Sequence, residues 1–153
     1  MKLEYRLDSK EEDYPALWLY DNLSVSELVS RMTCEYFVIE GNTYHVIMTA
    51  KEPENLTVIY VKREEFKNNS GDFKYDLIGF EYKEVIEKDN YQLIQTKELE
   101  SHDEALLTLH CDAVYLEKDG SLKEFKVDSR EIDEDRKCYV YYGTFSNMVL
   151  AYE

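Results

Sequence analysis

"CEYFVIEGNTYHVIMTA" (residues 34–50) decides the fold class, because its apolar residues flank a glycine–asparagine pair and recur with a period of two. That period is typical of a half-buried β-strand. Gly41-Asn42 is a two-residue turn of the kind that joins adjacent antiparallel strands. The stretch therefore predicts a β-hairpin, and further strands are expected on both sides of it.

These further strands are each bounded by a turn or a loop. The clearest are residues 2–7, 56–63, 138–143 and 146–153, together with 105–127 around Asp119-Gly120. Every connection that can be interpreted is a hairpin, so we expect a mainly β (α+β) fold, an antiparallel meander of roughly ten strands. Such a sheet curves, and it closes into a barrel or splits into a sandwich. The residues expected in the core are Phe37, Ile39, Val46, Met48, Ile59, Val61, Leu107, Leu109 and Val140.

One short helix is predicted over residues 24–33. Ser24 is placed to cap its N-terminus, and Glu27 stands three positions later, as a capping box requires. The apolar stripe that should pack on the sheet consists of Val25, Leu28, Val29 and Met32. A length of 153 residues fits a single domain, 1–153.

Two segments share the order apolar strand, tight turn, apolar strand, namely residues 35–50 and 105–127. Their sequences are too different to indicate a duplication. The sequence therefore gives no ground to infer a duplication.

The charge restricts the partners, because 33 acidic residues stand against 18 basic ones and the net charge is −15. An exposed acidic surface repels nucleic acid and anionic membranes, so we expect neither as a partner. No segment reaches the roughly 18 apolar residues of a membrane span, and no signal peptide is recognisable. Three widely spaced cysteines without a CxxC motif indicate free thiols in a cytoplasmic protein. Lysine exceeds arginine, which suggests an AT-rich bacterial or phage genome.

The stretch ALLTLHCDAVYL (residues 105–116) holds the chemical candidates, and we expect it to form a strand. His110 and Cys111 would then face opposite sides, which excludes a Cys–His pair. His102 would lie about 27 Å from His110, too far to share a zinc ion. We expect no metal and no cofactor. His110 and Asp112 share a face and are weak candidates for a base and its orienting carboxylate; the alternative is an outer polar patch.

Motifs of the common enzyme classes are missing from the sequence. The five glycines lie too far apart for a phosphate-binding loop, and HExxH, GxSxG and the calcium-loop pattern do not occur. We therefore expect no catalytic activity, with a motif-free enzyme that uses His110 as base kept as an alternative.

The predicted binding surface combines tyrosines with an acidic loop at residues 129–137. The expected side chains are Tyr139, Tyr141, Glu131, Asp133, Glu134 and Asp135. Exposed rings beside carboxylates suit a surface rich in Lys and Arg. In composition the chain resembles small acidic proteins that neutralise a basic protein partner, of the inhibitor, immunity or anti-defence type. A β-barrel that binds a small molecule is the other alternative.

Overall fold

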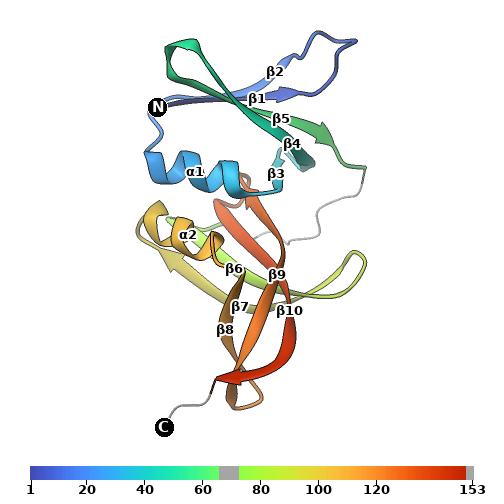
Figure 1. Ribbon diagram of the computed structural model, residues 1–153, viewed down its shortest axis with the longest axis vertical. Coiled ribbons are helices and arrows are strands. Elements are labelled where there is room, and N and C mark those ends of the chain that lie inside the picture. The colour runs from blue at the N-terminus through green and yellow to red at the C-terminus, as the bar shows by residue number, and fades with distance from the viewer. Residues whose placement is uncertain (66–72, 151–153) are drawn as a thin grey trace.

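The secondary structure of the protein is given by a computed structural model, which describes residues 1–65 and 73–150. Two α-helices and ten strands lie in these ranges (Figure 1). In chain order they are β1 (Lys2–Leu7), β2 (Ala16–Tyr20), α1 (Val25–Thr33), β3 (Tyr36–Ile39), β4 (Asn42–Glu52), the short 3₁₀ helix η1 (Pro53–Asn55), β5 (Leu56–Arg63), β6 (Ile78–Glu87), β7 (Asn90–Leu99), α2 (His102–Leu109), β8 (Ala113–Lys118), β9 (Ser121–Asp133) and β10 (Cys138–Leu150).

The ten strands form one mixed sheet, so the mainly β prediction is confirmed and the purely antiparallel meander is wrong. The strand order is β2-β1-β5-β4-β3-β9-β10-β6-β7, with β8 paired to β9. The hairpins are antiparallel as expected, but β1–β5, β3–β9 and β6–β10 are parallel. Parallel neighbours need long crossovers, which local turn signals do not report.

The sheet consists of two halves with the same topology, and we call residues 1–65 repeat 1 and residues 73–150 repeat 2. Repeat 1 has the order β2-β1-β5-β4-β3, and repeat 2 has the order β7-β6-β10-β9-β8. In both repeats the first and fifth strands are parallel, and the helix follows the second strand. The chain is therefore an internal duplication, which the sequence comparison of its segments did not reveal.

Strand registers assign equivalent positions in the two repeats. Leu3 pairs with Tyr20 and Thr57, while Phe80 pairs with Lys97 and Tyr139. Equivalent residues therefore differ by 77 up to the helices (80 − 3 and 97 − 20) and by 82 in the fifth strand (139 − 57). A register shift also recurs, after Val46 in β4 and before Gly143 in the β9–β10 ladder. Among the side chains that are the same in both repeats are Glu4/Glu81, Tyr5/Tyr82, Ser24/Ser101 and Cys34/Cys111.

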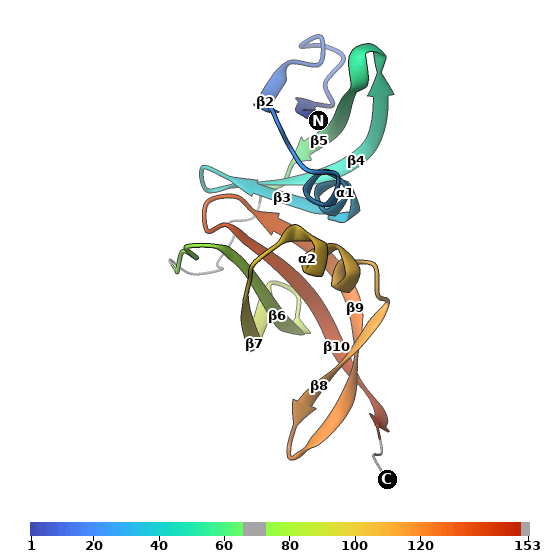
Figure 2. The ribbon, with the colours of Figure 1, turned by 90° about the vertical axis from the view of Figure 1, so that its left-hand side faces the viewer.

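The repeats meet through β3 and β9 and through their helices, which lie next to each other (Figure 2). The ladder between β3 and β9 pairs Tyr36 with Glu131 and Phe37 with Ile132. A hydrogen bond between Ser26 and Asp103 joins the first turns of α1 and α2. We call this contact of α1 and β3 with α2, β9 and residues 134–137 the repeat interface.

The stretch around residues 102–109 is helix α2 and not the predicted strand. Ala105 and Leu109 lie four positions apart and are buried, whereas Leu107 is 73% exposed. A short apolar run fits a strand or a buried helical face equally well, and Asp103 and Glu104 favour the positive end of a helix. Among the other predicted core residues, Val46 is half-buried and Met48 is exposed, while the remainder are buried.

Helix α1 begins as predicted, because the Ser24 hydroxyl accepts a hydrogen bond of 3.1 Å from the Glu27 amide. Its packing follows the prediction in part: Leu28 is buried and Met32 packs against the core, but Val25 is exposed. Ser30 and Arg31 are buried in addition. Ser30 and Arg31 are buried because repeat 2 covers a side of α1 that would face the solvent in repeat 1 alone.

The cap of α1 provides a testable difference between the repeats. Ser24→Ala should lower the free energy of unfolding by about 1 kcal/mol, because an amide of the first turn loses its partner. Ser101 is the equivalent residue in α2 and makes no side-chain capping bond. Ser101→Ala is the matched control and should change the urea midpoint much less; equal effects would contradict the assignment of the cap.

Candidate functional site

The predicted binding surface lies mostly inside the protein. Tyr139 and Tyr141 are 0% exposed, and Glu131 and Asp133 are 4% and 1% exposed. The expected exposure of these four side chains is wrong, because β9 continues through Asp133 and both faces of the sheet are covered there. Glu134 and Asp135 keep partial exposure in the turn after β9.

The two tyrosines and the two acids face opposite sides of the sheet. Tyr139 and Tyr141 belong to the main core beneath the helices. Glu131 and Asp133 lie on the other side, where Arg136 donates to Asp133 at 2.8 Å and Tyr142 donates to Glu131 at 3.2 Å. Burial, together with the charge of Asp133, raises the pKa of Glu131 to about 7.

His110 and Asp112 do not form the oriented pair that was considered for catalysis. His110 lies exposed at the C-terminus of α2, with Nε2 3.0 Å from the Thr33 hydroxyl. The Asp112 side chain is fully exposed and 3.8 Å from Arg130. Neither residue lines one of the two pockets described below.

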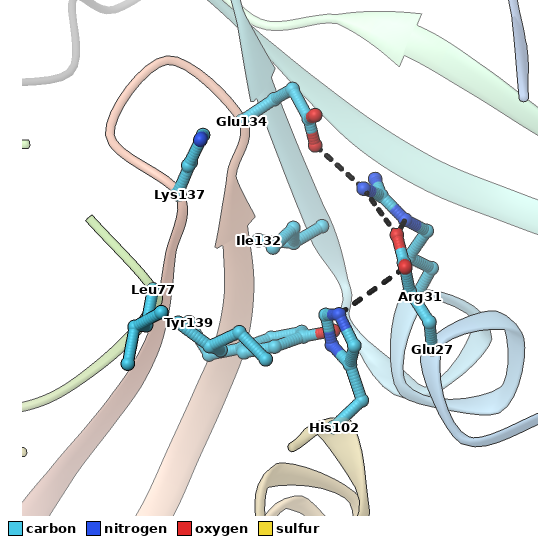
Figure 3. Close-up of a pocket in the computed structure, with 9 residues that line it drawn as sticks. Glu27, Arg31, Leu77, His102, Ile132, Glu134, Lys137 and Tyr139 are labelled. Atoms are coloured by element: carbon cyan, nitrogen blue, oxygen red, sulfur yellow. Dashed lines mark hydrogen bonds and ion pairs between the residues drawn. The ribbon is translucent and has the colours of Figure 1, made fainter. Parts of the chain in front are cut away.

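A pocket of about 170 Å³ opens at the repeat interface (Figure 3). Both helices, the start of β6 and the residue before it, β9, β10 and the turn between these two strands contribute to it, so it lies where the repeats meet. Ligand pockets are commonly formed at such contacts between structural units. Its lining residues are Glu27, Arg31, Leu77, Ile78, His102, Ile132, Glu134, Lys137 and Tyr139.

A chain of polar contacts crosses one wall of this pocket (Figure 3). Arg31 bonds Glu27 at 3.0 Å and Glu134 at 2.6 Å, and its guanidinium lies 4.3 Å from the centre of the Tyr20 ring. Arg31 itself is buried. Two carboxylates from different repeats are therefore fixed by one buried cation.

His102 extends this chain from Glu27 to Tyr139. Its Nε2 lies 3.2 Å from the Glu27 carboxylate, and its Nδ1 lies 2.9 Å from the Tyr139 hydroxyl. A carboxylate only accepts, so Nε2–H donates to Glu27, and in the neutral imidazole Nδ1 accepts from the phenol. Burial raises the pKa of Tyr139, which keeps this phenol protonated. Both ring nitrogens are thus engaged, which suits a structural clamp better than a general base.

The Glu27 carboxylate of the pocket carries charge at neutral pH. The hydrogen bond from His102, followed by the charge of Arg31, lowers the pKa of Glu27 to about 2 against the effect of burial. Glu134 retains 30% of its side-chain exposure. Lys137 is exposed at the pocket and makes no ion pair with the residues that the structure describes.

A wider hollow of about 530 Å³ lies elsewhere, against β6 and β7. Exposed Phe73 and Leu93 line it, with the buried Tyr75 hydroxyl donating to Glu81 at 2.7 Å. The small-molecule alternative finds its support here, because the hollow is mainly apolar and large enough for an organic ligand.

The pocket was not predicted from the sequence, because each of its residues could be explained by its own neighbours in the chain. Glu27 was assigned to a capping box, His102 was considered only as a zinc ligand together with His110, and 75 positions separate the two residues (102 − 27). The available signal was the recurrence of Ser24 and Glu27 as Ser101 and Glu104, which would have indicated two helices in equivalent places.

Three further findings concern metal binding, membrane spans and similarity to known proteins; the first two refer to residues 1–65 and 73–150. No group of three or more His, Cys, Asp or Glu side chains in these ranges is arranged to hold a metal ion. Neither of the two helices found there has the length and apolar character of a membrane span. Comparison of the chain with models of protein families, with curated proteins and with solved structures finds no match.

Proposed function

We propose that the chain is an acidic binding protein and that the pocket at the repeat interface receives a basic side chain of a protein partner. The observation that carries this proposal is the charge of the pocket wall. Glu27 and Glu134 share the buried cation Arg31, so the wall that they form carries one carboxylate more than cations. Lys137 also lines the pocket but makes no ion pair with either carboxylate among the contacts of the described residues.

The chemistry of the pocket suits the end of a Lys or Arg side chain. Such a side chain buries its aliphatic stem on apolar surface while its charge stays near water. Here Ile78 and Ile132 offer apolar surface, and the partly exposed Glu134 carboxylate can accept from the cation. A pocket of about 170 Å³ is smaller than the roughly 300–1,000 Å³ that hold drug-sized ligands, so one side chain fits better than a cofactor.

The overall charge of −15 supports the same partner class, because it attracts basic surfaces from a distance and speeds their encounter. An inhibitor, an immunity protein or an anti-defence protein that covers a basic surface would use such a field. The site proposed now keeps Glu134 from the sequence prediction and replaces the buried tyrosine pair by the pocket.

The proposal is tested by titrating tetralysine into ¹⁵N-labelled protein and following the amide signals by NMR. We expect shifts concentrated at His102, Glu134 and Lys137 that weaken as salt is added. Glu134→Gln should raise the dissociation constant by about tenfold, because the one carboxylate in excess on the pocket wall is lost. Lys137→Gln should lower it, because a like charge is removed from the pocket.

Glu117→Gln is the matched control, since Glu117 is exposed on β8 and changes the net charge equally. Circular dichroism verifies that each variant is folded. If the Glu117 and Glu134 variants lose binding equally, the loss comes from the change in net charge, and the pocket is not the binding site. Shifts confined to Phe73 and Leu93 with an apolar probe in place of tetralysine would favour the small-molecule alternative.

A further inference from the structure

We infer that the protein associates with itself head to tail, through a second copy of the contact that joins its two repeats. The inference rests on the internal duplication and is independent of the proposed function. Each repeat carries two surfaces: one built by its helix and third strand, and one built by the end of its fourth strand. Only one of each is used within the molecule.

The unused surfaces follow from the assigned equivalences. At the repeat interface β3 pairs with residues 131–133 of β9. The equivalent of β3 is β8, and the equivalent of 131–133 is 50–52 of β4, because Glu52 and Asp133 are the last residues paired before their hairpin loops. Among the described residues β8 pairs only with β9, and the end of β4 pairs only with β5. Both edges are therefore open.

The helices show the same asymmetry in their exposure. Ser30 of α1 is 0% exposed, whereas its equivalent Leu107 of α2 (30 + 77) is 73% exposed. Cys34 is buried, whereas its equivalent Cys111 is exposed. The side of α1 that repeat 2 covers thus has an uncovered counterpart on α2, which exposes Leu107 and Cys111.

The two unused surfaces lie toward opposite ends of the molecule. In Figure 1 the hairpin of β8 and β9 is at the bottom, and the hairpin of β4 and β5 is at the top. A contact between unlike surfaces leaves one surface of each kind free on the resulting pair. Such heterologous contacts produce open chains or rings of copies and do not stop at a symmetric dimer.

Charge complementarity supports a second copy as the occupant. Within the molecule, Ile132 lines the pocket together with Glu27 and Arg31 of α1 (Figure 3). The equivalent set is Lys51 on β4 with Glu104 and Thr108 on α2. The cation that α1 supplies as Arg31 is missing from α2, and Lys51 of the next copy would supply it to Glu104. Both Lys51 and Glu104 are exposed in the single chain.

Sedimentation equilibrium over a wide concentration range tests the inference. We expect the weight-average mass to rise with concentration and to exceed that of a dimer. Lys51→Glu should weaken association by about tenfold, because it places two acids together. The additional exchange Glu104→Lys should restore it. Lys62→Glu is the matched control, since Lys62 is exposed on β5 away from both surfaces.

A crosslink identifies the register of the contact independently of charge. Because Phe37 pairs with Ile132, Val114 of one copy should lie opposite Lys51 of the next. In a Cys111→Ser background, Val114→Cys and Lys51→Cys chains should form a disulfide when mixed and not when separate. A monomer at all concentrations without a mixed disulfide would overturn the inference, and so would association that the charge exchange fails to restore. Neither readout involves Glu134, so the proposed function stands or falls separately.

Discussion

Replacing Arg136 with methionine is expected to lower the free energy of unfolding by about 3–5 kcal/mol. Arg136 is 3% exposed and donates to both oxygens of Glu81, at 2.9 and 3.0 Å, and to Asp133 at 2.8 Å. Methionine keeps much of the volume but supplies no charge. Glu81 then keeps only the more distant Lys83 ammonium, at 3.7 Å, as a cation, and Asp133 loses its bond from Arg136, so the desolvation of both carboxylates is compensated much less. Urea unfolding followed by circular dichroism measures the difference.

The control for this prediction is Arg63→Met, since Arg63 is exposed and bonds the Asn42 side chain at 2.6 Å. Exposed arginine contacts contribute at most about 1 kcal/mol, so little change is expected. The Arg136 variant should also recover part of its stability in acid, where its former partners become protonated. An effect as small as that of Arg63→Met would show that the buried network does not hold the sheet.

Replacing Glu131 with glutamine is expected to stabilise the protein by about 3 kcal/mol above pH 7. Burial raises the pKa of Glu131 to about 7, with Asp133 adding to the effect, so folding opposes its ionisation. The glutamine amide oxygen can still accept the hydrogen bond that Tyr142 donates at 3.2 Å. The variant therefore removes a buried charge and keeps the contact.

The pH dependence distinguishes this cause from better packing. The folded state holds its proton up to about pH 7, while an unfolded carboxyl releases it near pH 4.3, so wild-type stability falls between these values. Below that window the two proteins should be equally stable, and above pH 7 the difference should be constant. Glu117→Gln, at an exposed site, should show no such profile. A difference that stays constant from pH 4 to 8 would contradict the assignment.

Local structure could be predicted wherever neighbouring residues decide it. The Asp119-Gly120 turn, the cap of α1 and the strands 2–7 and 56–63 follow from short-range geometry, and the structure contains all of them. The turn of the first hairpin was predicted at Gly41-Asn42. In the structure it lies one residue earlier, at Glu40 and Gly41, which both have positive φ. Parallel pairing and the helix at 102–109 depend on contacts between distant segments and could not be derived locally.

The candidate site was predictable only in part for the same reason. Glu134 was predicted only as one of four acidic residues of the loop, and its partner Arg31 lies 103 positions earlier. Acidic residues in a charged stretch suggest exposure, yet Asp133 is buried because Arg136 compensates its charge. The amino-acid sequence does not show which charged residues are paired with an opposite charge in the folded protein.

The parallel ladders also set an order in which a growing chain can acquire structure. Repeat 1 closes when β5 reaches β1, before any residue of repeat 2 is needed. Until β9 and β10 arrive, the α1 side that carries Ser30 and Arg31 faces water. Partly made proteins aggregate through exposed apolar surface, and a charge placed there acts as a gatekeeper. We therefore expect the charge of Arg31 to oppose such aggregation during synthesis, and the same guanidinium binds Glu134 once the chain is complete.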